Sequence, residues 1–240
     1  MRVELIAHTT APMAVCDLAA GTCTSGSIPP LHRGDGDGTG PLRAAMASGH
    51  ESVAEHASFT FAIEGISRAC SHQLVRHRMA SYSQQSQRYV KMDGFEYVTP
   101  ESIKKHQKVS HVDSGYEGDH RTYKWSYNDH YSKLMNDARG LYKRMIEAGI
   151  PEEDARYILP NACTTNIVVT MNARELRHFF SLRCCARAQW EIRELAEAML
   201  LQLRDVSPVL FADAGPRCGS LGYCPESDGC GRMPRREVDA

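Results

Sequence analysis

The sequence lacks an apolar run long enough to cross a membrane, and its first residues, MRVELIAHTT, lack the pattern of a signal peptide. We therefore expect a cytoplasmic protein with no membrane partner. The chain also has no large excess of charge of one sign. The 28 basic and 29 acidic residues leave a net charge of −1, so no global field would attract nucleic acid. The chain has 240 residues, enough for one large domain or two small ones.

Recognisable metal-binding motifs are missing too. The stretch GHESVAEH (49–56) does not have the HExxH spacing of zinc proteases. The stretch GDGDGTG (34–40) lacks the glycine spacing of a dinucleotide fingerprint, and Met46 stands where a calcium loop needs a glutamate. We therefore predict no metal site in the chain.

Nine cysteines cannot all form disulfide pairs, because their number is odd. Buried packing is the favoured role for most of the six that lie in or beside apolar stretches: Cys16, Cys23, Cys70, Cys163, Cys184 and Cys185. The other three, Cys218, Cys224 and Cys230, lie in a Gly/Pro-rich tail without CxxC spacing. A metal site is the less favoured alternative there. We expect a catalytic domain at 1–210 and a separate tail at 211–240.

Acidic residues are absent between Gly65 and Met92, although this segment carries five basic residues, a local charge of +5. Residues 174–187 carry four arginines against Glu175, a local +3. The remaining residues then sum to −9, because −1 − 5 − 3 = −9. Positive charge gathered in two segments suggests a compact anion site, since arginine suits planar, bidentate recognition of phosphate. A solvated basic loop is an equal alternative at 76–89.

Hydrophobic periodicity gives the expected elements. Alternation predicts strands at 1–9 and 57–65, the latter with Phe59, Phe61 and Ile63 inward, and a β-branched run predicts a third at 165–172. Helices are expected over about 41–49, 67–76, 121–148, 151–159, 173–184 and 188–204. The pattern lacks regular βαβ alternation. It therefore predicts an α+β fold, an antiparallel sheet packed with long helices.

Two expected helices have a clear apolar stripe. In 121–148 the stripe consists of Tyr131, Leu134, Met135, Ala138, Leu141, Tyr142 and Met145. In 173–184, Leu176, Phe179, Phe180 and Arg183 share one face. Arg183 continues an apolar stripe and should be half-buried, so it needs a partner. Two interpretations stay open: Arg183 meets a ligand, or it caps the negative end of its own helix.

The sequence resembles the flavin-dependent thymidylate synthases. The resemblance rests on Arg76-His77-Arg78, followed after seven residues by Ser86, and on GHESVAEH, ARYILP and MNARELRHFFSLRCCARAQWEI (171–192). These segments occur in the family's order over about residues 44–204. The resemblance implies a single-domain enzyme that assembles as a homotetramer with shared active sites.

The resemblance also implies the ligands of individual residues. Positions that match the family's deoxyuridine monophosphate (dUMP) contacts are Gln73, Arg76, Gln84, Gln85, Ser86, Gln87, Arg88, Arg156 and Arg183. Positions that match its FAD contacts are His50, Ser52, Arg76, His77, Arg78, Gln84, Asn172, Arg174 and His178. Arg183 matches the arginine thought to favour ionisation of uracil N3, and it is the expected catalytic residue.

The implied reaction is methylene transfer from 5,10-methylenetetrahydrofolate, a folate, to dUMP. Flavin hydride completes the methyl group and NADPH reduces the flavin. A thiolate at Cys184 or Cys185 is the chemically possible alternative, since a nearby cation would stabilise it. The sequence departs from some members at Gln84, Arg187 and Gly21, where Glu, His and Arg also occur.

Two other functions are alternatives to this one. A related flavoenzyme could add a different one-carbon group or use another pyrimidine nucleotide, and the residues named above do not separate it from a thymidylate synthase. A nucleic-acid-binding loop is opposed by the near-neutral total charge and by the few aromatic residues in 76–89, Tyr82 and Tyr89. We therefore expect no nucleic-acid partner.

Overall fold

The computed structural model describes residues 1–30, 40–106, 109–114 and 121–235. Most of the GDGDGTG stretch lies outside these ranges, so its exclusion as a calcium or nucleotide loop stays a prediction. The chain divides into two compact units. The first consists of 1–64, 72–83 and 166–240, and the second of 65–71 and 84–165.

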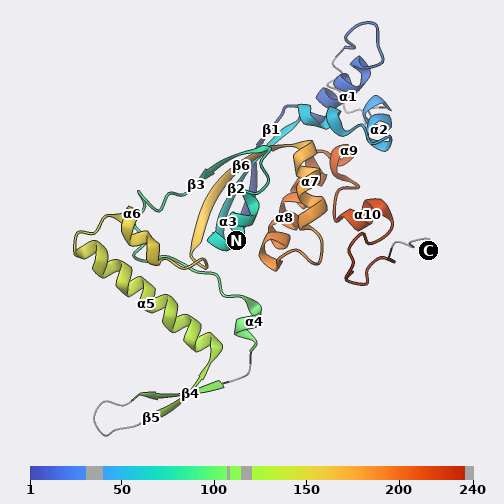
Figure 1. The fold of residues 1–240 in the computed structure, drawn as a ribbon. Coiled ribbons are helices and arrows are strands. Elements are labelled where there is room, and N and C mark those ends of the chain that lie inside the picture. The colour runs from blue at the N-terminus through green and yellow to red at the C-terminus, as the bar shows by residue number, and fades with distance from the viewer. Residues whose placement is uncertain (31–39, 107–108, 115–120, 236–240) are drawn as a thin grey trace. The chain divides into compact units, whose positions relative to one another are not determined.

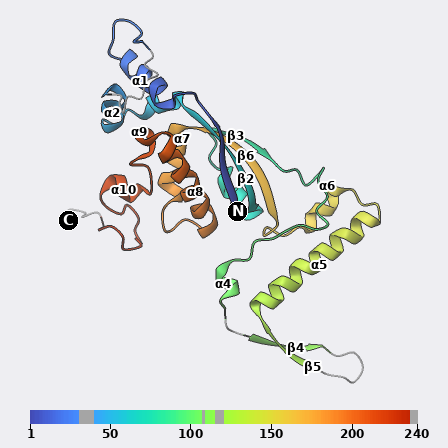
Figure 2. The same cartoon turned by 180° about the vertical axis from the view of Figure 1, so that it is seen from behind.

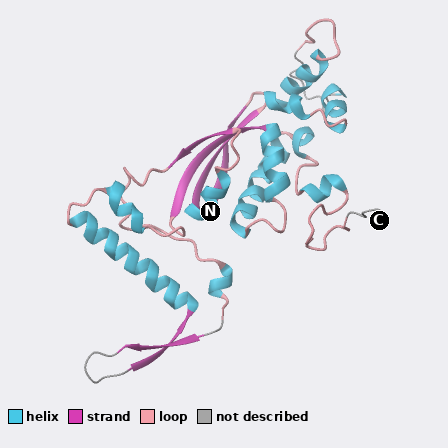
Figure 3. Cartoon of the chain, viewed as in Figure 1, coloured by secondary structure: helices cyan, strands magenta, loops and turns pink. Residues whose placement is uncertain are grey.

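A four-stranded sheet with the order β1-β2-β6-β3 carries the first unit (Figure 1). Its strands are β1 (Arg2–His8), β2 (Ser58–Ser67), β3 (Ala80–Gln84) and β6 (Thr164–Asn172). Strand β1 pairs antiparallel with β2, with Val3 opposite Ile63 and Leu5 opposite Phe61. The three predicted strands are confirmed. The fourth, β3, falls inside the segment that we expected to be a loop, where Figure 3 draws it as an arrow.

The helices of the first unit include two long ones that lie beside the sheet, α7 (Ala173–Arg183) and α8 (Trp190–Val206), as Figures 1 and 2 show. Both were predicted from the sequence. The shorter elements are α1 (Pro12–Thr22), α2 (Gly40–Ala47), the 3₁₀ helix η1 (Glu51–His56), α9 (Pro208–Phe211) and α10 (Arg217–Leu221). Helix α2 ends before Gly49, whose φ of 77° is a conformation that glycine adopts without strain.

The core of this unit is the one that the periodicity predicted. Phe59, Phe61 and Ile63 of β2 are at most 1% exposed, and Ile192, Leu195, Met199 and Leu203 of α8 are fully buried. Phe59 meets Phe211 edge-to-face, with 5.4 Å between the ring centroids. Burial of each such side chain contributes roughly 1.5–3 kcal/mol to the free energy of unfolding. The core therefore fixes α7 and α8 and the residues that they carry.

Helix α3 (Arg68–Leu74) confirms the helix expected at 67–76 but ends two residues earlier. Arg76 therefore follows the helix, although the expected helix included it. Its backbone N–H still donates to the Gln73 carbonyl at 3.4 Å.

The second unit is built around α5 (Tyr127–Glu147). It also contains α4 (Glu101–Lys104), α6 (Glu152–Ala155), the 3₁₀ helix η2 (Arg156–Ile158) and a hairpin of β4 (Val109–Ser114) and β5 (Arg121–Ser126). Helix α5 is shorter than predicted, because 121–126 form β5 rather than its first turns. Ser126 caps the helix: its hydroxyl accepts from Asp129 N at 3.2 Å, and Asp129 Oδ2 accepts from Ser126 N at 2.8 Å.

A small core holds α5 in the second unit. Its buried residues are Met92, Phe95, Tyr142, Ala155 and Cys163. The Tyr142 hydroxyl accepts a hydrogen bond from the Met92 backbone N–H at 3.2 Å. The predicted stripe of α5 is only partly buried, since Leu134 and Leu141 are 61% and 41% exposed. None of the helices in the described ranges is both long and apolar enough to span a membrane.

Candidate functional site

His77 lies at the centre of the polar groups in the first unit and is only 5% exposed. Burial, together with the charges of Arg183 and His178, lowers its pKa to about 4, so the ring is neutral at pH 7. Arg183 Nε donates to His77 Nε2 at 3.2 Å. Because arginine can only donate, Nε2 must be unprotonated, and the ring proton sits on Nδ1. That proton points to Glu175 Oε1, 3.3 Å away.

Arg183 ends α7 and is partly buried, as its apolar stripe predicted. Its second contact is a 3.5 Å hydrogen bond from Nη2 to the Gln73 carbonyl, at the end of α3. The hypothesis that Arg183 caps its own helix is wrong, because the carbonyl that it meets belongs to α3. Within the described parts of the chain the guanidinium has no acidic partner. A half-buried cation with two neutral acceptors retains hydrogen-bonding capacity for a ligand.

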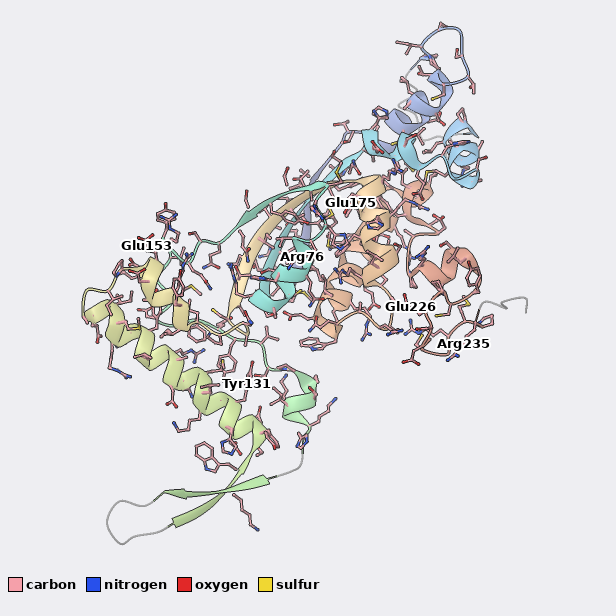
Figure 4. All side chains as sticks on the ribbon, in the orientation of Figure 1. Arg76, Tyr131, Glu153, Glu175, Glu226 and Arg235 are labelled. Atoms are coloured by element: carbon pink, nitrogen blue, oxygen red, sulfur yellow. The ribbon has the colours of Figure 1, made fainter. Side chains whose placement is uncertain are left out.

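Glu175 is held by the start of α7, where Figure 4 labels it. The Asn172 side chain caps this helix by accepting from Glu175 N at 2.9 Å. Burial raises the pKa of Glu175, and the charge of His178 opposes that rise. The same acid contributes, after burial, to the raised pKa of Tyr82, whose hydroxyl donates to the carbonyls of Leu74 and His77.

Three predicted flavin residues, Asn172, Arg174 and His178, line one pocket of about 350 Å³ in the first unit. Its other lining residues are Glu51, Glu55, Met79 and Glu175. Arg174 is exposed and pairs with Glu55. Solvent screens an exposed pair of this kind strongly, so a ligand phosphate can take the place of the carboxylate. The volume lies at the lower end of ligand pockets, roughly 300–1,000 Å³, and suits part of a dinucleotide.

The turn after α3 carries Arg76 and Arg78, and both side chains are exposed. Neither makes an ion pair or a side-chain hydrogen bond with any residue that the structure describes. These two cations offer the donors that a diphosphate requires. The arrangement and chemistry of this turn and of the neighbouring pocket therefore fit a flavin dinucleotide.

His50 and Ser52 lie at the start of η1, and both are exposed. Glu51, between them, accepts from Arg177 Nε at 3.1 Å. Arg177 also makes a two-pronged pair with Asp213, with contacts of 2.7 and 2.9 Å. This network ties η1 to α7, so it positions the two predicted flavin residues.

The second unit carries the remaining predicted nucleotide residues. Gln84 is fixed, because its Nε2 donates to Ser71 Oγ at 3.0 Å and to Thr165 Oγ1 at 3.2 Å. Gln85 and Gln87 are partly buried, and Ser86 Oγ accepts from the Arg88 backbone N–H at 3.2 Å.

Glu153, labelled in Figure 4, contacts two predicted dUMP-binding arginines of the second unit. Arg88 contacts its carboxylate at 3.1 Å through Nε, and Arg156 Nε donates to its backbone carbonyl at 3.0 Å. Each arginine also lies over a neighbouring ring, Tyr89 and Tyr157. The sequence separates Arg88 from Arg156 by 68 residues, so no local pattern predicted this pair.

The sequence interpretation did not predict that two acidic residues, Glu175 and Glu153, contact the candidate site residues. Glu175 is the only acid in the basic segment 174–187, and that isolation was the available signal. Glu153 stands among three acids at the start of α6 and had no distinguishing feature.

Among the cysteines, Cys16, Cys70, Cys163 and Cys184 are buried, which confirms the packing role for these four. Burial, with a contribution from Glu197, raises the pKa of Cys184 to about 12. Cys184 therefore stays a neutral thiol at pH 7, although Arg183 precedes it. The described residues contain no group of three His, Cys, Asp or Glu side chains that could hold a metal ion.

Comparison with known proteins places the chain in a family. The family described as "Thymidylate synthase complementing protein" matches residues 4–209. A flavin-dependent thymidylate synthase of Geobacter sulfurreducens is 49% identical over 231 residues, which cover 94% of this chain and 91% of the relative. The chain belongs to the flavin-dependent thymidylate synthases. The family member from Pyrococcus furiosus is 44% identical, covering 99% of this chain and 96% of its own length.

The flavin-dependent thymidylate synthase fold is also supported by a solved structure. The chain is similar to a UMP/dUMP methylase PolB from Streptomyces cacaoi bound with 5-Br dUMP, with a TM-score of 0.67 and 31% identity. The match covers 88% of this chain and 93% of that one. The architecture is thus a mixture of helices and antiparallel sheet, as the sequence predicted.

Proposed function

We propose that this chain methylates dUMP to dTMP, with 5,10-methylenetetrahydrofolate as the one-carbon donor and NADPH, acting through FAD, as the reductant. Family membership at 44–49% identity over nearly the whole chain supports the reaction. The observation in the structure that supports it most directly is Arg183, a partly buried cation whose described partners are a neutral imidazole and a carbonyl. Uracil O2, and N3 once it has lost its proton, are acceptors for the remaining N–H groups of this guanidinium.

Arg183 would act on the uracil ring through electrostatics. A cation fixed beside N3 and O2 stabilises negative charge on the ring and so makes C5 more nucleophilic. His77 holds the guanidinium from one side, and the Gln73 carbonyl holds it from the other. Preorganised donors of this type cost no reorganisation when charge develops.

The other assigned residues would bind and orient the ligands. Gln73, Arg76, Arg156 and the segment 84–88 would hold dUMP, with the arginines on its phosphate. The residues assigned to FAD are His50, Ser52, Arg76, His77, Arg78, Gln84, Asn172, Arg174 and His178. A bound flavin would supply the hydride that turns the transferred methylene into a methyl group. Tetrahydrofolate is the leaving group of the transfer, and the proton of uracil C5 is released to solvent.

Product formation tests the proposal. Full-length protein reconstituted with FAD is incubated with dUMP, methylenetetrahydrofolate and NADPH, and dTMP is measured by chromatography. We expect dTMP only when all three substrates are present. UMP is assayed in parallel, because the similar methylase acts on UMP or dUMP by its name. Methylation of UMP in preference to dUMP would replace the proposed substrate, and no methylated product from either would overturn the proposal.

A further inference from the structure

A second pocket of about 380 Å³ lies between the end of α7 and the C-terminal tail. One wall comes from the segment 181–188, which contains Arg183. The opposite wall comes from the tail and consists of Pro216, Arg217, Cys218, Cys224, Pro225, Glu226, Cys230 and Arg232. The tail lies beyond residues 4–209, which match the family description, although the Pyrococcus furiosus relative covers 99% of the chain.

The tail is held against this segment by defined contacts. Arg187 Nη1 meets Glu226 Oε2 at 3.4 Å and donates to the Asp228 carbonyl at 3.0 Å. Glu226 is labelled on the tail in Figure 4. Within the tail, Cys224 N donates to the Pro234 carbonyl at 2.7 Å. These bonds make the tail a wall of the pocket and fix the turn that follows Arg183.

The lining is strongly basic. Arg183, Arg187, Arg217 and Arg232 face a single acid, Glu226, and that acid is already paired with Arg187. The side chains of Arg217 and Arg232 make no ion pair or hydrogen bond with the residues that the structure describes. A pocket with three uncompensated guanidinium groups selects an anionic ligand, because each group offers paired donors to a carboxylate or phosphate.

We propose that the tail completes a subsite for the anionic end of a co-substrate, and that this end is the glutamate carboxylates of methylenetetrahydrofolate. The proposal rests on the function proposed above. In that reaction the one-carbon unit must reach C5 of uracil, and Arg183 polarises this uracil ring. The donor's reactive end therefore lies near Arg183, and its glutamate end extends away from it into a pocket that shares Arg183 as a wall residue. The phosphates of NADPH present the same chemistry and are the second possible source.

The test uses full-length, FAD-reconstituted protein with both Arg217 and Arg232 changed to alanine. We expect the KM for methylenetetrahydrofolate to rise about tenfold, since each lost exposed ion pair weakens binding by about two- to fivefold. The KM values for dUMP and NADPH should stay within about twofold of wild type, and so should kcat. Calorimetric titration with p-aminobenzoylglutamate should show the same weakening in Kd, independently of turnover.

Two further variants serve as controls. Arg235→Ala removes the same charge from an exposed position of the tail that does not line the pocket, and it should leave all constants unchanged. The double lysine variant, R217K/R232K, keeps the charge and should recover most of the binding if the alanine variant is folded.

A rise in the NADPH KM alone would assign the pocket to phosphates and overturn the folate assignment. Unchanged KM values for both co-substrates, in a variant that still forms dTMP, would overturn the subsite itself. If the unmodified protein forms no dTMP, the proposed function fails first, and p-aminobenzoylglutamate binding still tests the pocket.

Discussion

At the scale of single residues, Arg183 and His77 form a pair in which each fixes the state of the other. The neutral imidazole accepts from the guanidinium, and the guanidinium helps to keep the imidazole neutral by lowering its pKa. The sequence predicted a half-buried Arg183 in need of a partner. It could not predict His77 as that partner, because 106 residues separate the two and only the fold brings them together.

Replacing Arg183 by alanine should remove turnover and leave the fold and the flavin in place. The predicted flavin contacts do not include Arg183, whereas charge stabilisation on uracil would be lost. Removal of one preorganised donor of this kind typically lowers kcat roughly 100- to 1,000-fold. Steady-state kinetics and the flavin absorbance of the purified variant check both parts. Near-normal turnover would remove the role assigned to Arg183.

His77 makes stability depend on pH in a definite direction. Its folded pKa of about 4 lies below the ordinary value of 6.5, so the unfolded chain binds the proton more tightly. The neutral His77 ring therefore makes its full contribution to the free energy of unfolding above pH 6.5. This contribution, on the order of 3 kcal/mol in total, is lost as the pH falls through 4.

We expect the stability difference between wild type and His77→Asn to shrink as the pH is lowered from 7 to 4. Urea unfolding of both proteins at several pH values measures this difference. The shared titration of carboxylates cancels in the comparison. A difference that stays constant over this range would mean that His77 is not held neutral by the fold.

The buried thiol next to Arg183 is expected to be dispensable for chemistry. Cys184 is a neutral thiol because burial raises its pKa to about 12. The variant with both Cys184 and Cys185 changed to serine should keep turnover within roughly tenfold of wild type, whereas removal of a true nucleophile costs about a millionfold. Initial rates measure this, with Cys184→Ala as a control for the polar serine in an apolar site. Abolished turnover with flavin still bound would restore a thiolate mechanism.

At the scale of elements, apolar periodicity predicted the long helices and three strands of the sheet. Strand β3 escaped it, because ASYSQ has no fully buried face and therefore no alternation of apolar side chains. The residues of β5 were expected in the following helix, because the capping signal at Ser126 was not used to place the start of that helix. Ser126 and Asp129 form a capping box that marks the true start of α5, and this S-x-x-D signal was present in the sequence.

The capping box also supports a quantitative prediction. Ser126→Ala removes the acceptor of the Asp129 N–H and should destabilise the protein by about 1 kcal/mol. Ser126→Asp, which can still cap, should be close to neutral. Thermal unfolding of the three proteins measures the effect, and equal melting temperatures for the alanine variant and wild type would show that the cap does not support α5.

At the scale of the whole molecule, the candidate residues divide between the two compact units. His77, Arg183 and the predicted flavin pocket belong to the first unit, and the segment 84–88 and Arg156 belong to the second. The motif and its order along the chain were readable from the sequence, because they are local. The contacts of Arg183 with His77 and of Arg88 with Glu153 were not, because each joins distant segments.

The homotetramer, the cytoplasmic location and the boundary at residue 210 stay predictions. The residues that line the proposed tail subsite all belong to the first unit.

We propose that one site binds both a flavin and a pyrimidine nucleotide. The most direct test is a visible absorption spectrum of the purified protein after reconstitution with FAD and removal of the excess. We predict a retained flavin band that shifts when dUMP is added, because both ligands share the site. A protein that is colourless after reconstitution would contradict the account.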